Sequence, residues 1–481
     1  MSRAESEAFE AEVRRVVDAI YGTPGQVTNP TNFEGKERDG IVFGRRNIVA
    51  FETTGLATVE KARKDGKKLA EICQSLRNQH PRMGVSGLFV TKHAPTADQV
   101  DVISEFGPDV SIISYADLKK EIVDSRDYLA KRENHRFGSA ADPDADYEDA
   151  PDHFTQEYVS LDFTETSPNQ RRIEIRNVDF VVDSLDQGRT IVLTGAFGAG
   201  KSMTAREVHR RLMRAHHLDP TKPFPVTLNL REHKGQSNPS EAIHRHCSII
   251  GFGHPDEIVS AWKAGFVHLI LDGFDEISTP ATWRGDADAI KEVRRSAMSL
   301  LRNFIEAHNS GLPKERKNSS GIFILGRHNV FDSHDEMVEM LGLSEKKNVS
   351  FLKTDEFTNE QVAEYLNRRG VTEDLPEWFP RRPLLLGYLV SANFLDLIQG
   401  EIRTASPTTG WDYLLDKIAA RESLLEDGFT ALLVRQVIER LASLSRLRGY
   451  VQQSDLARVY TEITNREPSD TVFHVLQRLP G

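Results

Sequence analysis

The chain has 481 residues, a formal net charge of −11 and two cysteines, Cys73 and Cys247. This length is typical of two to four domains, and an apolar content of 39% permits a sizeable core. The negative charge excludes a surface that attracts nucleic acid everywhere, so any such contact requires a local basic patch. The low cysteine content excludes a disulfide framework or a zinc finger and indicates a reducing compartment.

The hydropathy of the chain indicates a cytoplasmic protein. The amino-terminal stretch MSRAESEAFEAEVRR lacks the apolar core of a signal peptide. No apolar run approaches the roughly 20 residues that cross a bilayer. We therefore expect no membrane contact.

The first predicted elements form a compact α/β domain over residues 1–125. Apolar residues recur at helical spacing from Glu5 to Tyr21. A hairpin follows in ERDGIVFGRRNIVAFETTG, residues 37–55. The pattern then predicts a helix over 59–77, strands over 85–90 and 110–114, and a short helix from Asp117. A mixed order of this kind favours one sheet with helices packed on it.

The predicted hairpin brings two carboxylates together. With GRRN as the turn, paired residues have numbers that sum to 91, so Asp39 faces Glu52. Facing residues have Cβ atoms about 5 Å apart, and like charges placed there destabilise the pair. A divalent cation between them would reverse the sign of this interaction. We therefore predict a metal site at Asp39 and Glu52.

An acidic segment separates this domain from a second α/β region. SAADPDADYEDAPD, residues 139–152, has few large aliphatic residues and predicts a linker, which we extend over 126–170. Beyond it, predicted strands alternate with helices, which favours a parallel sheet. These strands lie at 190–194, 225–230, 267–272, 321–326 and 349–352, and the pattern from 359 onward is mostly helical.

A phosphate-binding loop is predicted at GAFGAGKS, between the strand TIVLTG and the helix MTAREVHRRLMRA. It matches the pattern G-x-x-x-x-G-K-[ST] in its expected strand–loop–helix context. We expect Lys201 to reach the β- and γ-phosphates and Ser202 to ligate Mg²⁺. The predicted nucleotide contacts are Gly195, Ala196, Phe197, Gly198, Ala199, Gly200, Lys201, Ser202 and Met203.

The stretch HLILDGFDE, residues 268–276, supplies the acids that such a site requires. It is an apolar strand that ends in carboxylates, at the sheet edge where open α/β sheets bind ligands. We expect Asp272 to hold the Mg²⁺ shell. Asp275 or Glu276 is expected to orient or deprotonate the attacking water.

LDGFDE after an apolar strand resembles the NACHT clade of STAND NTPases, which act as nucleotide-dependent switches. FILGR resembles the sensor strand of that clade, and RRPLLLGYL its helical-domain segment. The resemblance implies ATP or ADP as ligand, with Arg327 near the γ-phosphate and Pro383 against the base. It further implies an NTPase domain over 171–356, a helical domain over 357–423 and a winged-helix-like domain over 424–481.

The hairpin with its two acids resembles the PD-(D/E)xK nuclease fold, especially the Mrr-like restriction-endonuclease branch. The resemblance implies Mg²⁺-dependent DNA cleavage, with Glu10 as an assisting acid. Thr54 departs from the pattern, because the family has a lysine at this position. The next helix offers Lys61, Lys64 and Lys68 on one face. We expect Lys64 to replace the missing lysine, with Lys61 as the second candidate.

Together these resemblances predict a nucleotide-switched nuclease that binds DNA and forms a homo-oligomer on activation by an unknown trigger. In bacteria this combination of domains resembles antiphage defence proteins. One alternative is an NTPase switch whose N-terminal domain is catalytically dead and binds DNA or a partner. A second alternative is an AAA+-like restriction enzyme that translocates DNA.

Overall fold

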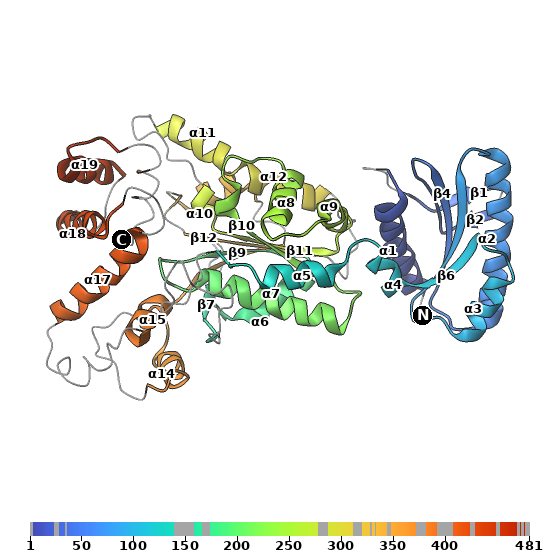
Figure 1. Cartoon of the computed structure of the whole chain (residues 1–481), viewed down its shortest axis with the longest axis horizontal. Helices are drawn as coiled ribbons and strands as arrows, with labels where there is room; N and C mark the ends of the chain where they lie inside the picture. Colours follow the sequence, from blue (N-terminus) through green and yellow to red (C-terminus); the bar gives the residue numbers. More distant parts are fainter. Residues whose placement is uncertain are drawn as a thin grey trace.

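A computed structural model gives the fold of the chain. It describes residues 3–23, 28–33, 36–138, 158–165, 174–277, 287–310, 320–327, 330–331, 333–343, 348–371, 381–391, 407–423, 429–448 and 453–468, with Val472 and Leu476. Figure 1 shows the N-terminal domain at one end of the molecule, a sheet flanked by helices in the middle, and α17, α18 and α19 at the other end. None of the helices in these ranges has both the length and the apolar composition needed to cross a membrane.

The N-terminal domain has three layers. Its sheet has the strand order β3-β4-β5-β6, in which β3 and β4 are antiparallel and the other pairs parallel. Its elements are α1 (Arg3–Tyr21), β1 (Thr31–Phe33), β2 (Lys36–Arg38), β3 (Gly40–Phe43), β4 (Asn47–Thr54), α2 (Val59–Gln79), β5 (Gly84–Thr91), α3 (Ala97–Ser104), β6 (Val110–Ser114) and α4 (Tyr115–Lys120).

The alternation of side chains along β4 decides which helix each residue meets. Val49 and Phe51 belong to the apolar cluster that contains the buried residues of α1. Ile48 and Ala50 belong to the cluster that contains the buried residues of α2. Because successive strand residues point to opposite faces, Glu52 continues the α2 face. This packing places a carboxylate between the sheet and a lysine-rich helix.

The predicted elements of this domain are confirmed, including the hairpin register. Gly40 pairs with Phe51 and Phe43 with Ile48, so the paired numbers sum to 91 as expected. The prediction missed the short β1–β2 pair and α3. The latter has only eight residues, which is too short for a clear helical pattern.

The second domain contains a seven-stranded sheet with the order β10-β11-β12-β9-β13-β7-β8. The first five strands are parallel and β7 and β8 are antiparallel additions. The strands are β7 (Phe163–Glu165), β8 (Glu174–Arg176), β9 (Thr190–Thr194), β10 (Phe224–Asn229), β11 (Val267–Asp272), β12 (Ile322–Gly326) and β13 (Val349–Thr354). The predicted parallel α/β sheet is confirmed, with strand bounds within two residues of those predicted.

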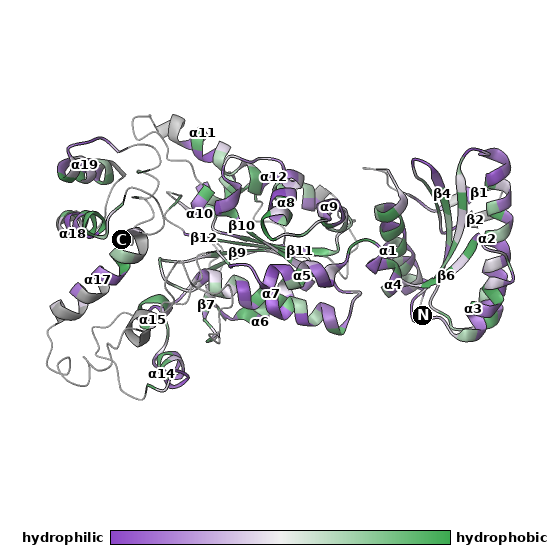
Figure 2. Cartoon of the chain, viewed as in Figure 1, coloured by the Kyte–Doolittle hydropathy of each residue, from purple (hydrophilic) through white to green (hydrophobic). Residues whose placement is uncertain are grey.

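Helices cover both faces of this sheet, and Figure 2 shows hydrophobic residues along its central strands. The strands β9, β10, β11 and β12 are buried on both faces, as parallel strands usually are, and β13 is buried apart from Val349 and Lys353. The helices of this region are α6 (Val178–Asp186), α7 (Lys201–Leu218), η1 (Leu230–His233), α8 (Pro239–Ile249), α9 (Pro255–Lys263), α10 (Phe274–Ile277), α11 (Ala287–Ala297), α12 (Ser299–Ser310) and α13 (His334–Leu341).

The region beyond the sheet is helical wherever the structure describes it. Its helices are α14 (Asn359–Asn367), α15 (Pro383–Ser391), α17 (Pro407–Ser423), α18 (Ala431–Arg448) and α19 (Gln453–Thr464). This agrees with the mostly helical pattern. The winged-helix assignment of 424–481 stays a prediction, since part of that region lies outside the described residues.

Part of the segment predicted as linker is regular structure. The helix α5 (Ser125–Glu133) begins one residue before 126–170 and occupies the start of that segment, and β7 pairs with β13 in the large sheet. Tyr128, Leu129 and Phe137 are buried, because this segment packs on the second domain. The acidic stretch 139–152 itself lies outside the described residues.

The two α/β domains meet at Phe266, which precedes β11. The Lys119 ammonium lies 4.5 Å from the centre of the Phe266 ring and donates to the Thr221 carbonyl. Arg15 of α1 donates to the Ala264 carbonyl at 3.4 Å. Burial lowers the pKa of Lys119 to about 7. The N-terminal domain therefore contacts the edge of the large sheet opposite the carboxyl ends of its strands.

Candidate functional site

The loop between β9 and α7 has the geometry of a phosphate cradle. Gly198 and Gly200 have φ of 70° and 88°, which only glycine adopts without strain. The loop ends at the start of α7, an 18-residue helix whose first N–H groups and dipole favour an anion. The order of the sheet places β9 between β12 and β13, at a switch point where such sheets bind ligands.

Lys201 lies inside this cradle. Its ammonium donates to the carbonyls of Gly195 and Ala196, each at 2.9 Å. Burial lowers the pKa of Lys201 to about 8, and the carboxylates of Asp275 and Asp272 oppose this effect. Nucleotide phosphates in the cradle would add negative charge and favour the ammonium form further.

Asp272 ends β11 beside the first turn of α7. Ser202 hydrogen bonds with its carboxyl group, and burial raises the pKa of Asp272 to about 7. The Oδ2 atom is buried and has no hydrogen-bond partner among the described residues. A buried carboxylate oxygen next to a serine hydroxyl is a donor set that Mg²⁺ prefers. The expected pair of Mg²⁺ ligands, Ser202 and Asp272, is thus brought together.

The two candidate water-activating acids have different surroundings. The Asp275 carboxylate pairs with Arg327, whose Nε lies 3.2 Å from Oδ2, and accepts from the Arg327 backbone N–H at 3.1 Å. Glu276 is partly exposed and acts electrostatically on both Asp272 and Lys201. Asp275 therefore links the end of β11 to Arg327, which follows β12, and Glu276 has the larger electrostatic effect of the two on Asp272.

Two predicted residues from distant parts of the chain flank the cradle. The Arg327 guanidinium lies 5.2 Å from the centre of the Phe197 ring in the loop. At α15, Pro383 lies 3.5 Å from the position that a Cβ on Gly200 would occupy. The adjacent Leu384 N–H donates to the Gly198 carbonyl at 3.2 Å. The helical region thus contacts the phosphate loop directly.

Gly138, which the sequence did not single out, also lies at this site. A Cβ at Gly138 would lie 2.1 Å from Asp272 Oδ2 and 2.7 Å from Ser202 Oγ. Its N–H donates to the Asn229 side chain at 2.8 Å. Gly138, which follows α5, therefore lies against the candidate Mg²⁺ ligands. No local pattern marks such a glycine, because the contact joins residues far apart in the sequence.

Residues 189–360 match the family model of the NACHT domain. This segment is a NACHT domain. It is a P-loop NTPase domain, so NTP binding and hydrolysis follow from the identification. The match lies within the predicted NTPase domain, 171–356, apart from its last residues.

Solved structures are similar to this chain only at low levels. The Aeropyrum pernix ORC2 protein is 13% identical with a TM-score of 0.33, and the alignment covers 63% of this chain and 83% of that chain. Domain III of the Thermotoga maritima replication initiation protein DnaA is 12% identical with a TM-score of 0.25, and covers 63% and 89%. Scores this low carry no argument about function. No curated protein matches the sequence.

Asp39 and Glu52 lie at the open end of the hairpin, although the strand pairing stops at Gly40 and Phe51 and does not include the predicted Asp39–Glu52 pair. Protein groups accompany both acids. Glu52 is 3% exposed, with Lys68 Nζ 3.4 Å from one oxygen and Arg38 Nη1 3.7 Å from the other. Asp39 accepts from the backbone N–H and hydroxyl of Thr53, at 2.7 and 2.9 Å. Protein groups therefore compensate part of the charge of each acid without a metal ion.

The residual electrostatic strain at Glu52 is nevertheless large. Burial raises the pKa of Glu52 to about 7, and the Asp39 carboxylate adds to the rise while Lys68 opposes it. The pKa of Glu10 is also raised, by burial and then by Asp39. Asp39 is thus the shared neighbour of Glu10 and Glu52. Among the described residues, these three do not bring their ligand atoms within 4.8 Å of one another.

The lysine nearest the acids is Lys68, and not Lys64 or Lys61 as expected. Lys64 is exposed, because it lies on the solvent side of α2. Lys61 pairs at 2.8 Å with Asp65, a fully buried acid of α2 that also pairs with Lys68 at 3.2 Å. Thr54 is buried, and its hydroxyl accepts from the Leu56 N–H at 3.1 Å. A signal for Asp65 was its placement between two lysines at i−4 and i+3.

Replacement of Asp272 tests the magnesium assignment. Asp272→Asn is expected to lower Mg²⁺-dependent NTP hydrolysis about a hundredfold, because the amide removes the anionic ligand. In the natural chain the rate should rise from pH 6 to pH 8, since protons compete with the metal below the raised pKa of this carboxyl. Phosphate release measures both effects, and turnover unchanged in Asp272→Asn would sink the assignment.

Proposed function

We propose that the chain is a nucleotide-switched NTPase that controls an N-terminal, metal-dependent DNA endonuclease. The observation that carries the nuclease half is the Lys68 ammonium, 3.4 Å from the buried Glu52 carboxylate. It supplies from α2 the positive charge that Thr54, two residues beyond Glu52 on the same strand face, lacks.

In this proposal each N-terminal residue has a chemical task. Asp39 and Glu52 hold the metal ion, which when bound polarises the scissile phosphate and lowers the pKa of water. Lys68 stabilises negative charge that develops on the phosphate. Asp65 positions Lys68 through the pair at 3.2 Å, and Glu10 assists near Asp39.

The segment 125–138 supports a physical link between the two activities. At one end, Ser125 Oγ lies 2.9 Å from His216 Nε2, close to the interface with the N-terminal domain. Arg132 is fully buried and donates to the Thr227 carbonyl of β10 at 2.9 Å. At the other end, Gly138 contacts Asp272 and Ser202. A change at the Mg²⁺–nucleotide site would therefore act on the segment that joins the NACHT domain to the nuclease-like domain.

The contacts of α15 with the phosphate loop support the switch itself. A nucleotide that fills the cradle would meet Pro383 and Leu384, so ADP and ATP can favour different positions of the helical region. In the proposed cycle the ADP form is inactive, and an unknown trigger permits exchange for ATP. The chains then form a homo-oligomer that brings nuclease domains together on DNA. The combination resembles bacterial antiphage defence proteins, which is the biological role proposed here.

The proposal is tested with the full chain and supercoiled plasmid. Cleavage is expected with Mg²⁺ or Mn²⁺, more with a non-hydrolysable ATP analogue than with ADP. Glu52→Gln should lower the rate about a hundredfold or more, because a metal ligand is lost. Glu60→Gln, an exposed acid in the first turn of α2, is the matched control and should leave the rate unchanged.

The pH dependence gives a second criterion. The raised pKa of Glu52, about 7, means that protons displace the metal ion below this pH, so cleavage should fall as pH falls through 7. In the Glu52→Asp variant, the pH at which the cleavage rate falls should change, because the shorter side chain moves the carboxyl group away from Lys68.

Two other outcomes would replace the proposal. DNA binding without cleavage in any metal would make the N-terminal domain a binding module. The hydrogen bond of Thr54 with Leu56 and the pairing of Glu52 with Lys68 and Arg38 would then explain the lack of cleavage. Rapid ATP turnover stimulated by DNA would instead identify a translocating motor. Neither outcome would alter the NACHT assignment.

A further inference from the structure

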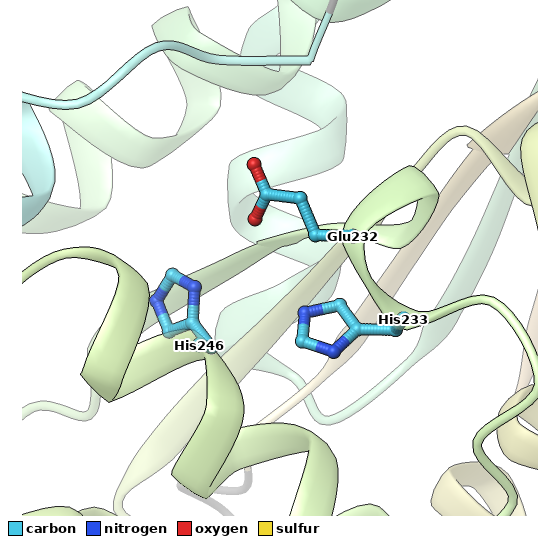
Figure 3. Close-up of side chains that lie close together, drawn as sticks. All are labelled: Glu232, His233 and His246. Carbon is cyan, nitrogen blue, oxygen red and sulfur yellow. The ribbon is translucent and has the colours of Figure 1, made fainter.

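A cluster outside both sites brings three ligand-type side chains together. Glu232 and His233 lie on η1, directly after β10, and His246 lies on α8. Figure 3 shows the two imidazole rings facing each other, with the Glu232 carboxyl group beside them. One ligand atom from each residue lies within 4.8 Å of the other two, which among the described residues holds for this group alone.

Each imidazole has one nitrogen engaged and the other without a partner. His233 Nδ1 hydrogen bonds with Gln236 Oε1 at 2.8 Å, while its Nε2 is buried and has no hydrogen-bond partner within the described ranges. His246 Nε2 hydrogen bonds with the Tyr128 hydroxyl at 2.9 Å, while its Nδ1 is likewise buried and without such a partner. The two rings are 1% and 2% exposed.

Glu232 shows the same division. Its Oε1 accepts from the Asn229 side-chain amide at 3.1 Å, and its Oε2 is buried without a hydrogen-bond partner among the residues described. Three buried polar atoms without hydrogen-bond partners in one place would destabilise the fold. A ligand that accepts an electron pair from each of the three atoms would remove this destabilisation.

The protonation states suit such a group. Burial lowers the pKa of His233, and it lowers the pKa of His246 well below the usual value with a further contribution from Arg132. His233 Nδ1 faces the Gln236 amide oxygen, which only accepts, so Nδ1 carries the ring proton and Nε2 has a lone pair. His246 Nδ1 has a lone pair in the tautomer in which Nε2 donates to the Tyr128 hydroxyl. Arg132 disfavours a cation nearby, and the Glu232 carboxylate offsets this charge.

We propose that Glu232, His233 and His246 bind a divalent transition-metal ion, with Zn²⁺ as the preferred ion. Two imidazoles and one carboxylate are a common Zn²⁺ ligand set, with bonds of about 2.0–2.2 Å. Ligand atoms around a tetrahedral ion with such bonds are about 3.4 Å apart, so binding would draw the three atoms together from the 4.8 Å within which they lie. The hydrogen bonds from Gln236, Tyr128 and Asn229 orient the ligands, as partners of metal ligands do elsewhere.

The position of the site defines its role as structural. The Glu232 carboxylate accepts a hydrogen bond from the Asn229 side chain. Asn229 of β10 pairs in the sheet with Asp272 of β11, which belongs to the nucleotide site. The His246 ring hydrogen bonds with the Tyr128 hydroxyl of α5. A metal ion here would fasten α5 to η1 and α8, beside the route from the N-terminal domain to Asp272.

The test uses the full chain, treated with a chelator, dialysed, and kept in excess Mg²⁺ to fill oxygen-rich sites. Titration with Zn²⁺ in competition with a chromophoric chelator should show about one tightly bound Zn²⁺ ion per chain. Co²⁺ in its place should give visible absorption typical of a four-coordinate nitrogen–oxygen site. His233→Gln and His246→Gln should each weaken binding by at least about tenfold.

Two variants keep the result interpretable. Glu232→Gln retains the size of the side chain and an oxygen for Asn229, so it should fold normally and still bind Zn²⁺ more weakly. His244→Gln is the matched control, since His244 is on the same helix but 44% exposed, and its binding should equal that of the natural chain. Circular dichroism and nucleotide binding report the fold.

Zn²⁺ should also raise the Tm of the natural chain, and by less that of Glu232→Gln. The proposal is overturned if the natural chain binds no tight Zn²⁺, which would make the three atoms a site for buried water. It is equally overturned if Zn²⁺ binds His233→Gln/His246→Gln as tightly as the natural chain.

Discussion

The Lys201→Ala variant is expected to bind ATP and ADP at least about a hundredfold more weakly than the natural chain. Lys201 is the buried cation of the phosphate cradle, and its ammonium lies 2.9 Å from two carbonyl groups of the loop. Its removal leaves buried phosphate charge without compensation. Fluorescent nucleotide titration measures the change, and hydrolysis should disappear with binding.

The control for this variant is Lys263→Ala. Lys263 ends α9 in the same domain and is exposed, so its loss should leave nucleotide affinity unchanged. Since Lys201 contacts only loop carbonyls among the bonds described, the variant should keep its secondary structure by circular dichroism. Nucleotide bound by Lys201→Ala with natural affinity would contradict the role assigned to the cradle.

The Lys68→Ala variant is expected to cleave plasmid about 10²–10³-fold more slowly, because the charge nearest the reacting phosphate is lost. Lys64→Ala, four residues earlier on the same helix, should cleave at nearly the natural rate. The contrast is sharp because the two variants remove the same side chain from the same helix. Of these two lysines, only Lys68 lies beside the Glu52 carboxylate.

The Lys68→Arg variant tests whether the positive charge at residue 68 acts directly in cleavage or whether the side chain only positions the helix. Arginine keeps the positive charge, so it should recover part of the rate lost in Lys68→Ala while both variants bind DNA alike. Equal cleavage by Lys68→Ala and the natural chain would remove the nuclease assignment. A large loss in Lys64→Ala with none in Lys68→Ala would restore the expectation drawn from the sequence.

The elements determined by the sequence alone are those that depend on local patterns. GAFGAGKS and HLILDGFDE predicted the phosphate loop and the acids of β11, because a strand, a tight turn and a helix start each have their own composition. The hairpin register followed from the turn GRRN, since pairing in a short hairpin is set by its turn. The alternation of strands and helices predicted the parallel sheet.

The choice among the lysines of α2 needed the tertiary structure. At 3.6 residues per turn, Lys61 and Lys68 lie within about 20° of each other around the helix, while Lys64 lies about 60° from Lys61 and about 40° from Lys68. The sequence shows this spacing but not which angle faces β4. That angle is decided by Ala62, Leu69 and Ile72, which pack on the sheet.

Contacts between distant segments were likewise beyond the sequence. Gly138 meets Asp272, Pro383 meets the phosphate loop, and His246 meets His233 only after the sheet has formed. The acidic composition of 139–152 predicted a linker that we extended over 126–170, yet Tyr128 and Arg132 are buried on β10 and its neighbours. Local sequence sets the propensity of a segment, whereas burial against another element depends on a surface that the segment itself does not encode.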